Sequence, residues 1–293
     1  MKIIENRNKF FWLSIIIIAI GIAVMIYNKL NGNGIFNYDV EFSGGTSIQI
    51  DIGKDFVNTD IEKIVSDATN QSSVQVQRVL NTNQVMIKIK SVEKSVRDKF
   101  INELAQKYGF DKKSVTISDI SPTISNEMQR SAVISILLAC LAIMIYVSIR
   151  FHNMKTGASA VIALMHDSAI TIISYAIFRI PLNYSFIAVV LTIVGYSINA
   201  TIVIFDRIRE NMLKFKNDNV KLINTSVMQT MRRSLFTSIT TLLSIICLYL
   251  LGVPSIKDFS LPIIIGIICG TYSSICLATS IWFSMNNKVK SKA

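Results

Sequence analysis

The sequence is poor in charge: 17% of its 293 residues are Asp, Glu, Lys or Arg, against roughly a quarter in a typical soluble domain. It has only four prolines and two histidines. Its four cysteines all lie within long apolar runs, so we expect neither a disulfide framework nor a Cys-x-x-Cys metal site. These shortages exclude a disordered chain, a disulfide-stabilised secreted scaffold and a typical soluble enzyme.

Apolar residues are instead abundant, at 51% of the chain. Six runs are long enough to cross a bilayer core of about 30 Å as helices; they cover residues 10–27, 131–149, 158–178, 181–205, 234–253 and 259–285. The first run exceeds the apolar core of a secretory signal and no small-residue cleavage site follows it, so it predicts a retained anchor. The sequence therefore predicts an α-helical membrane protein with six transmembrane helices.

The distribution of lysine and arginine predicts the orientation of these helices. The N-terminus, the loops 150–156 and 206–233 and the C-terminal tail hold fifteen basic residues, whereas the two opposite short loops hold two. Positive charge favours the inner side of the membrane, so both termini are expected in the cytoplasm. Because residues 28–130 carry equal numbers of basic and acidic side chains, the net charge of +11 is a topology signal with attraction to the lipid bilayer, and we expect no nucleic-acid binding.

The polar block between the first two runs predicts an exported α+β domain. Alternating apolar residues predict four strands and apolar stripes predict two helices, in the order βαββαβ of a ferredoxin-like domain. Thr59 and Glu62 predict a capping box at the first of these helices. The domain has no histidine, no carboxylate pair and no phosphate loop, so hydrolytic chemistry is not expected. The predicted organisation is 1–30 (cytoplasmic N-terminus and first span), 31–125 (exported domain), 126–285 (spans two to six) and 286–293 (cytoplasmic basic tail).

One acidic residue, Asp167, lies about ten residues inside an apolar run. Its neighbour His166 points about 100° away on a helix, so the two side chains need not touch. Ionisable groups in the membrane are costly and mark function by default. Two interpretations remain open: an ion-responsive carboxylate, or a structural acid hydrogen-bonded to neighbouring helices. Small and hydroxyl residues in the later runs, such as Gly266 and Gly270, are expected to serve helix packing.

A charged segment leaves the fourth run at the cytoplasmic face. It contains Asp206, Arg207, Arg209 and Glu210. Arg209 and the pair 232–233 are candidates to bind Asp206, Glu210 or lipid phosphates. The alternative is an interfacial cluster that only sets topology.

Four motifs, in order along nearly the whole chain, resemble those of the SecF family, the smaller half of the SecD/SecF accessory of bacterial protein export within the RND superfamily. They are Val40-Glu41-Phe42-Ser43-Gly44-Gly45-Thr46, then Ala163-Leu164-Met165-His166-Asp167, then Gly195-Tyr196-Ser197-Ile198-Asn199-Ala200-Thr201 continuing to Phe205-Asp206-Arg207-Ile208-Arg209-Glu210-Asn211, and Thr230-Met231-Arg232-Arg233-Ser234 followed by Thr237-Ser238. Gly44 and Gly45 suit a hinge or a close backbone approach at the root of the exported domain, although glycine also simply ends turns.

The resemblance implies a non-enzymatic subunit of the bacterial cell membrane, without cofactor or metal. It would pair with SecD beside the SecYEG channel, with YidC as a further candidate partner, and would use ion-motive force to draw a preprotein outward after SecA has driven it through. The resemblance makes Asp167, His166, Asn199 and Arg233 candidate ion-coupling residues. Ala200, however, stands where the family has an aspartate, so coupling falls to SecD, to Asp167, or to a different mechanism.

Two other functional classes are weighed against this one. An RND-type half-transporter for a small solute or lipid would need a deep apolar pocket in the exported domain. A membrane sensor would need a cytoplasmic signalling domain, and the longest inner segment is the 206–233 loop.

Overall fold

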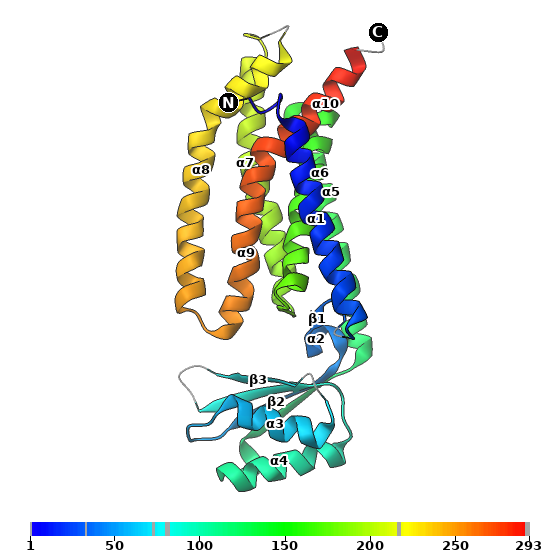
Figure 1. The fold of residues 1–293 in the computed structure, drawn as a ribbon, viewed down its shortest axis with the longest axis vertical. Coiled ribbons are helices and arrows are strands. Elements are labelled where there is room, and N and C mark those ends of the chain that lie inside the picture. The colour runs from blue at the N-terminus through cyan, green and yellow to red at the C-terminus, as the bar shows by residue number, and fades with distance from the viewer. Residues whose placement is uncertain (1, 33, 72–73, 80–82, 216–217, 291–293) are drawn as a thin grey trace. The chain divides into compact units, whose positions relative to one another are not determined.

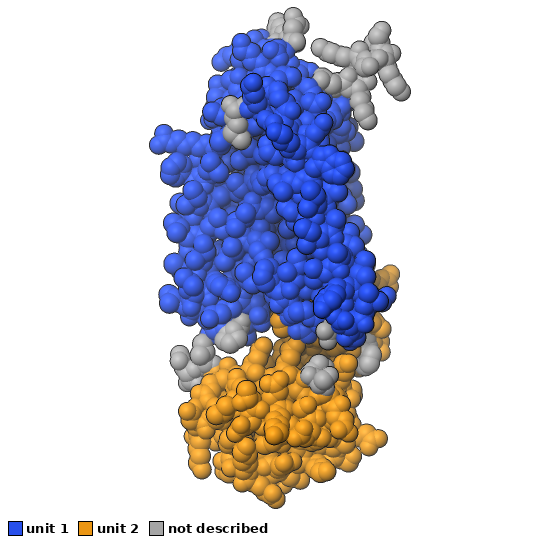
Figure 2. Space-filling model, viewed as in Figure 1, with its two compact units in different colours: residues 1–37, 133–180, 185–293 blue, residues 38–132, 181–184 orange. Residues whose placement is uncertain are grey.

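The computed structural model describes residues 2–32, 34–71, 74–79, 83–215 and 218–290; the end of the predicted basic tail, 291–293, lies outside them. The chain forms two compact units (Figure 2). Unit 1 comprises Met1–Asn37, Val133–Ile180 and Ser185–Ala293, and unit 2 comprises Tyr38–Ala132 and Pro181–Tyr184. The predicted domain boundaries at residues 31 and 125 stay predictions.

Unit 1 is a bundle of long apolar helices (Figure 1). Six helices are long and apolar enough to cross a membrane, which confirms the six predicted spans. They are α1 (Arg7–Leu30), α5 (Pro122–Phe151, whose first residues belong to unit 2), α6 (Met154–Ile177), α7 (Ser185–Asn211), α8 (Asn219–Leu251) and a last span of α9 (Pro254–Tyr272), η2 (Ser273–Ala278) and α10 (Thr279–Lys290).

The helix α6 and the last span form the centre of unit 1. Of their most apolar windows 61% and 67% are buried, against 11% for α1 and α8. Small residues allow this close packing: a Cβ added at Gly266 would lie 2.6 Å from side-chain atoms of Ile193, and one at Gly270 would lie 3.1 Å from Ser197. The predicted packing role of these glycines is confirmed.

The last span contains a π-helical segment, η2, between α9 and α10. All six of its residues are buried, and it contacts α6, α7 and α1. Short π segments inside α-helices are rare and occur frequently at functional sites. The segment directs attention to the helices around it.

Unit 2 contains the predicted succession of strands and helices. It runs β2 (Gly45–Asp51), α3 (Asn58–Thr69), β3 (Gln75–Arg78), β4 (Gln84–Ile89), α4 (Lys94–Tyr108), η1 (Lys112–Ser114) and β5 (Val115–Ile120). The four strands form an antiparallel sheet in the order β3-β4-β2-β5, with Ile48 opposite both Ile87 and Ile117. The helices α3 and α4 pack on one face of the sheet, where alternate strand residues such as Ile48 and Ile87 are fully buried (Figure 1).

Two local predictions are wrong. Helix α3 begins at Asn58 after Val57, which provides no side-chain cap, so Thr59 lies inside the helix and the predicted capping box does not form its start. The fourth apolar run also does not begin as a helix at Pro181: Pro181–Leu182 is strand β6, paired with β1 (Asn37–Tyr38), and α7 begins at Ser185. Proline lacks the N–H of a helix interior but is tolerated in an edge strand. A short helix, α2 (Val40–Ser43), precedes β2.

Candidate functional site

The carboxyl group of Asp167 is the centre of a polar cluster inside unit 1. Asp167 lies in the middle of α6 and is completely buried. Its position follows from the sequence of α6, which places apolar residues around it on every side of a central helix. A buried carboxyl group costs free energy unless its oxygens are paired.

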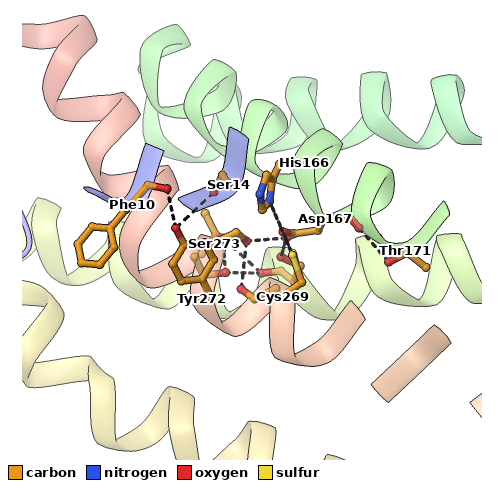
Figure 3. Close-up of polar contacts among 12 residues, drawn as sticks. Phe10, Ser14, His166, Asp167, Thr171, Cys269, Tyr272 and Ser273 are labelled. Carbon is orange, nitrogen blue, oxygen red and sulfur yellow. Dashed lines mark hydrogen bonds and ion pairs between the residues drawn. The ribbon is translucent and has the colours of Figure 1, made fainter. Parts of the chain in front are cut away.

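Both carboxyl oxygens of Asp167 are paired, by residues of four elements (Figure 3). Oδ2 accepts hydrogen bonds of 2.6 Å from the hydroxyl of Ser197 on α7 and from that of Ser273 in η2. Oδ1 lies 3.0 Å from Nδ1 of His166 and 3.3 Å from Sγ of Cys269 on α9. We call these five residues the Asp167 cluster.

A second layer of hydrogen bonds ties the cluster to the surrounding helices. The hydroxyl of Thr171 donates to the main-chain oxygen of Asp167 at 2.8 Å. The hydroxyl of Ser274 donates to the main-chain oxygen of Ser197 at 3.2 Å. The ring of Tyr272 lies 6.4 Å from that of His166, and its hydroxyl donates to the main-chain oxygen of Phe10 on α1 at 2.8 Å (Figure 3). A change at Asp167 therefore reaches α1, α7 and η2.

The cluster contains no permanent positive charge. Among the described residues, His166 is the only basic side chain within ion-pair distance of Asp167. The second ring nitrogen of His166, Nε2, is buried and has no hydrogen-bond partner in the described part of the chain. An ionised Asp167 is thus stabilised by hydroxyl and thiol dipoles, whereas a protonated one is accommodated because serine hydroxyls can rotate from donating to accepting.

Three donor atoms of the cluster, from His166, Asp167 and Cys269, lie within 4.8 Å of one another, which is close enough to hold a metal ion. Hydrogen bonds to a single shared oxygen, Oδ1 of Asp167, account for the same arrangement. No cofactor or metal is therefore needed to explain the geometry.

The sequence identified only part of this cluster. The contact between His166 and Asp167 was not expected from their 100° separation, because it depends on side-chain torsions. Ser197, Cys269 and Ser273 were missed: the cysteine was interpreted as a packing residue and the serines carried no distinguishing signal. Only the packing of α7 and α9 against α6 brings them to the carboxyl group.

The other two candidate coupling residues, Asn199 and Arg233, form a separate set. They line a cavity of about 40 Å³ between α7 and α8, together with Ala200 and hydroxyl residues; the lining is Tyr196, Asn199, Ala200, Val203, Arg233, Ser234, Thr237 and Ser238. Among the described residues, no carboxylate forms an ion pair with Arg233. The four predicted coupling residues are thus divided between two places.

The charged segment at the end of α7 does not pair as expected. Asp206 forms an ion pair of 3.2 Å with Arg150 at the end of α5, and Glu210 pairs with Arg207 one turn away at 2.8 Å. The expected pairing of these acids with Arg209 or the pair 232–233 is wrong, because Arg150 and Arg207 lie nearer. Arg209 donates instead to the main-chain oxygen of Arg150 at 3.5 Å.

The first motif lies in unit 2 and forms a tight junction. Gly44 and Gly45 have φ angles of +75° and +155°, and a Cβ at Gly45 would overlap the main-chain oxygen of Ile89. A close backbone approach therefore requires glycine here, whereas the hinge stays a prediction.

Two acids attach this junction to its surroundings. Glu41 accepts the main-chain N–H of Tyr184 at 2.6 Å, and burial raises the pKa of Glu41. The hydroxyl of Thr46 donates to Asp119 at 2.7 Å, and this bond, with the nearby Arg97, lowers the pKa of Asp119.

Comparison with known proteins gives consistent results. The family model "Protein export membrane protein SecD/SecF, C-terminal" matches residues 100–288. A "Protein translocase subunit SecF" from Alicyclobacillus acidocaldarius is 32% identical, covering 96% of this chain and 92% of its own length. That of Acidaminococcus fermentans is 30% identical, covering 99% and 98%.

Longer relatives match over part of their length. A "Protein translocase subunit SecDF" from Bacillus subtilis is 31% identical, covering 97% of this chain but 38% of its own. The crystal structure of SecDF from Thermus thermophilus, described as a translocon-associated membrane protein, superposes with a TM-score of 0.80 at 28% identity, covering 98% of this chain and 39% of that one. This chain thus spans about two fifths of the fused relatives.

Proposed function

The chain belongs to the SecD/SecF family of protein export membrane proteins, and we propose that it is the accessory subunit of a Sec machinery that promotes preprotein translocation by means of ion-motive force. It is a multi-pass membrane protein. Its role is not enzymatic: the relatives are named as translocase subunits. It acts after SecA has transferred the preprotein, with energy that does not come from ATP.

The main partner in this proposal is a SecD-like protein. The fused SecDF relatives contain this chain as about two fifths of their length, so the remainder corresponds to a separate subunit here. Large apolar side chains on α8, such as Leu235, Ile239 and Leu243, are exposed in the single chain and offer a surface for such a partner. The SecYEG channel, SecA, YidC and the preprotein complete the proposed assembly.

In the proposed arrangement unit 2 is the exported domain. Its strand order β3-β4-β2-β5 with two helices on one face is that of a ferredoxin-like domain. Both termini lie in the cytoplasm, in accord with the excess of lysine and arginine in the corresponding flanking segments. Movement of this domain draws the preprotein outward.

One observation carries the coupling mechanism: a completely buried carboxyl group at the junction of α6, α7, α9 and η2 has four hydrogen-bond donors and no ion-paired lysine or arginine in the described part of the chain. When Asp167 takes up a proton, one oxygen changes from acceptor to donor, and Ser197 or Ser273 must rotate its hydroxyl to accept. The two states favour different packing of α7 and η2 against α6, which makes the bundle a two-state element biased by the proton.

Reconstitution tests this function. Proteoliposomes with SecYEG and SecA are prepared with and without this chain and its SecD-like partner, and release of a preprotein that SecA has already inserted is measured without ATP. We expect release to require the chain and an ion gradient, and an ionophore to abolish it. Release that is unaffected by the ionophore would contradict the proposed use of ion-motive force.

A further inference from the structure

A cavity of about 220 Å³ lies at the end of unit 1 where α5, α6, α7 and α10 meet. Its floor consists of the buried side chains of Phe151, Phe205, Ile208 and Trp282. The indole N–H of Trp282 donates to Thr156 at 3.0 Å, which fixes the ring in the floor. Pockets for drug-sized molecules are usually larger than roughly 300 Å³, so this one suits a small polar group attached to an apolar body.

The rim of the cavity is positively charged. Arg209 lines it and, among the described residues, forms no ion pair with a carboxylate; its recorded contact is the weak bond to the main-chain oxygen of Arg150. The neighbouring charges are neutralised by one another, Asp206 by Arg150 and Glu210 by Arg207. The guanidinium of Arg209 is therefore the charge in this segment that still lacks a counter-ion.

The start of α6 adds to this positive potential. Asn153, the N-cap of α6, also lines the cavity, and the partial positive charge at a helix N-terminus favours an anion. Together with Arg209 it makes an anion-binding rim above an aromatic floor.

The cavity lies at the depth of lipid headgroups. The apolar part of α7 runs from Ser185 to Phe205, which at about 1.5 Å per residue spans roughly 30 Å, the thickness of a bilayer core. Arg209 follows one turn later. A ligand here has its anionic group beyond the hydrocarbon and its body beside it, and basic pockets between transmembrane helices at the cytoplasmic side suit phospholipid headgroups.

We propose that this cavity is a binding site for an anionic phospholipid, with the phosphate held by Arg209 at the rim beside Asn153 and the first acyl carbons on Trp282 and Phe205. The site is distinct from the Asp167 cluster and does not depend on the export function. It predicts a preference for phospholipids with a net negative headgroup.

Native mass spectrometry of the delipidated full chain in an uncharged detergent tests the site, with phosphatidylglycerol and phosphatidylcholine of identical acyl chains as probes. We expect phosphatidylglycerol to bind at least about tenfold more tightly, and Arg209→Ala to lower this affinity about tenfold, since charge-assisted hydrogen bonds to phosphate are lost. The matched control is Arg207→Ala, which removes the same charge from the same helix but leaves the cavity intact. We expect it to change the affinity less than twofold.

Three results would overturn the proposal: equal binding of the two lipids, equal losses in the two arginine variants, or displacement of the lipid by inorganic phosphate at a similar concentration, which would identify free phosphate as the ligand. Should Arg209→Ala fail to fold, Trp282 provides a second measurement. The chain has two tryptophans, so Trp12→Phe leaves Trp282 as the reporter. Its fluorescence should change with phosphatidylglycerol and not with phosphatidylcholine, and an unresponsive Trp282 would equally contradict the site.

Discussion

Replacing Asp167 by asparagine and by leucine separates an ion-responsive carboxyl group from a structural one. Asparagine has nearly the same shape, and its oxygen can still accept the hydroxyl groups of Ser197 and Ser273. Its amide can donate to His166, whose Nδ1 then acts as the acceptor. Leucine has a similar volume but offers no acceptor at all. Neither variant carries a proton that can be exchanged.

The structure gives the size of the expected effects. In Asp167→Leu the donors from Ser197, Cys269 and His166 lose their acceptor, whereas Ser273 retains the main-chain oxygen of Gly270 at 3.2 Å. A buried unsatisfied group costs about 1–3 kcal/mol, and hydrogen bonds between membrane helices average nearer 0.6 kcal/mol. The free energy of unfolding should therefore fall by roughly 2–4 kcal/mol in Asp167→Leu and by less than about 1 kcal/mol in Asp167→Asn.

Two assays are needed for each variant: unfolding of the purified protein in detergent, and ion-driven export in the reconstituted system at equal membrane levels. If Asp167 is the switch, Asp167→Asn should remain stable but lose most of the ion-driven stimulation. Asp206→Asn is the matched control, because it makes the same chemical change in a surface ion pair with Arg150. A fully active Asp167→Asn protein would refute the switch and move ion coupling to the partner subunit.

Three further predictions concern other parts of the chain. Burial raises the pKa of Glu41 in the folded state, so its ionisation opposes folding above the unfolded pKa of about 4.3; Glu41→Gln should raise the melting temperature at pH 7, with a gain that vanishes near pH 4, and an equal gain at both pH values would show another cause. Arg233 lines the cavity with Ala200, whereas Arg232 lies over the ring of Phe236 outside it, so export should fall several-fold more in Arg233→Ala than in Arg232→Ala, and the reverse order would refute the assignment. Residues 35–122, which hold a core of their own, should fold alone; a hydrogen-exchange experiment that finds no protected amides in this fragment would disprove it.

Much of the architecture could be predicted because it depends on local patterns. Each transmembrane helix must satisfy its own backbone within lipid, so an uncharged run of sufficient length such as residues 234–253 determines its structure almost alone. The strands of unit 2 were readable from alternation, as in β2, where Ile48 and Ile50 face the core. The errors, at Thr59 and Pro181, lie at element boundaries, where tertiary contacts decide the outcome.

The sequence by itself determined that the chain crosses the membrane six times, and it singled out Asp167, because a lone acid in an apolar run is conspicuous against its surroundings. It did not determine what surrounds that acid. The partners Ser197, Cys269 and Ser273 come from helices that are distant in sequence, and serine and cysteine are ordinary packing residues of membrane helices. Tertiary structure alone also left Arg209 without an acid, because Arg150 and Arg207 take the two nearest carboxylates. Pairing between side chains depends on the rotation and depth of each helix in the bundle, and those are fixed by packing between helices rather than by the sequence of any one of them.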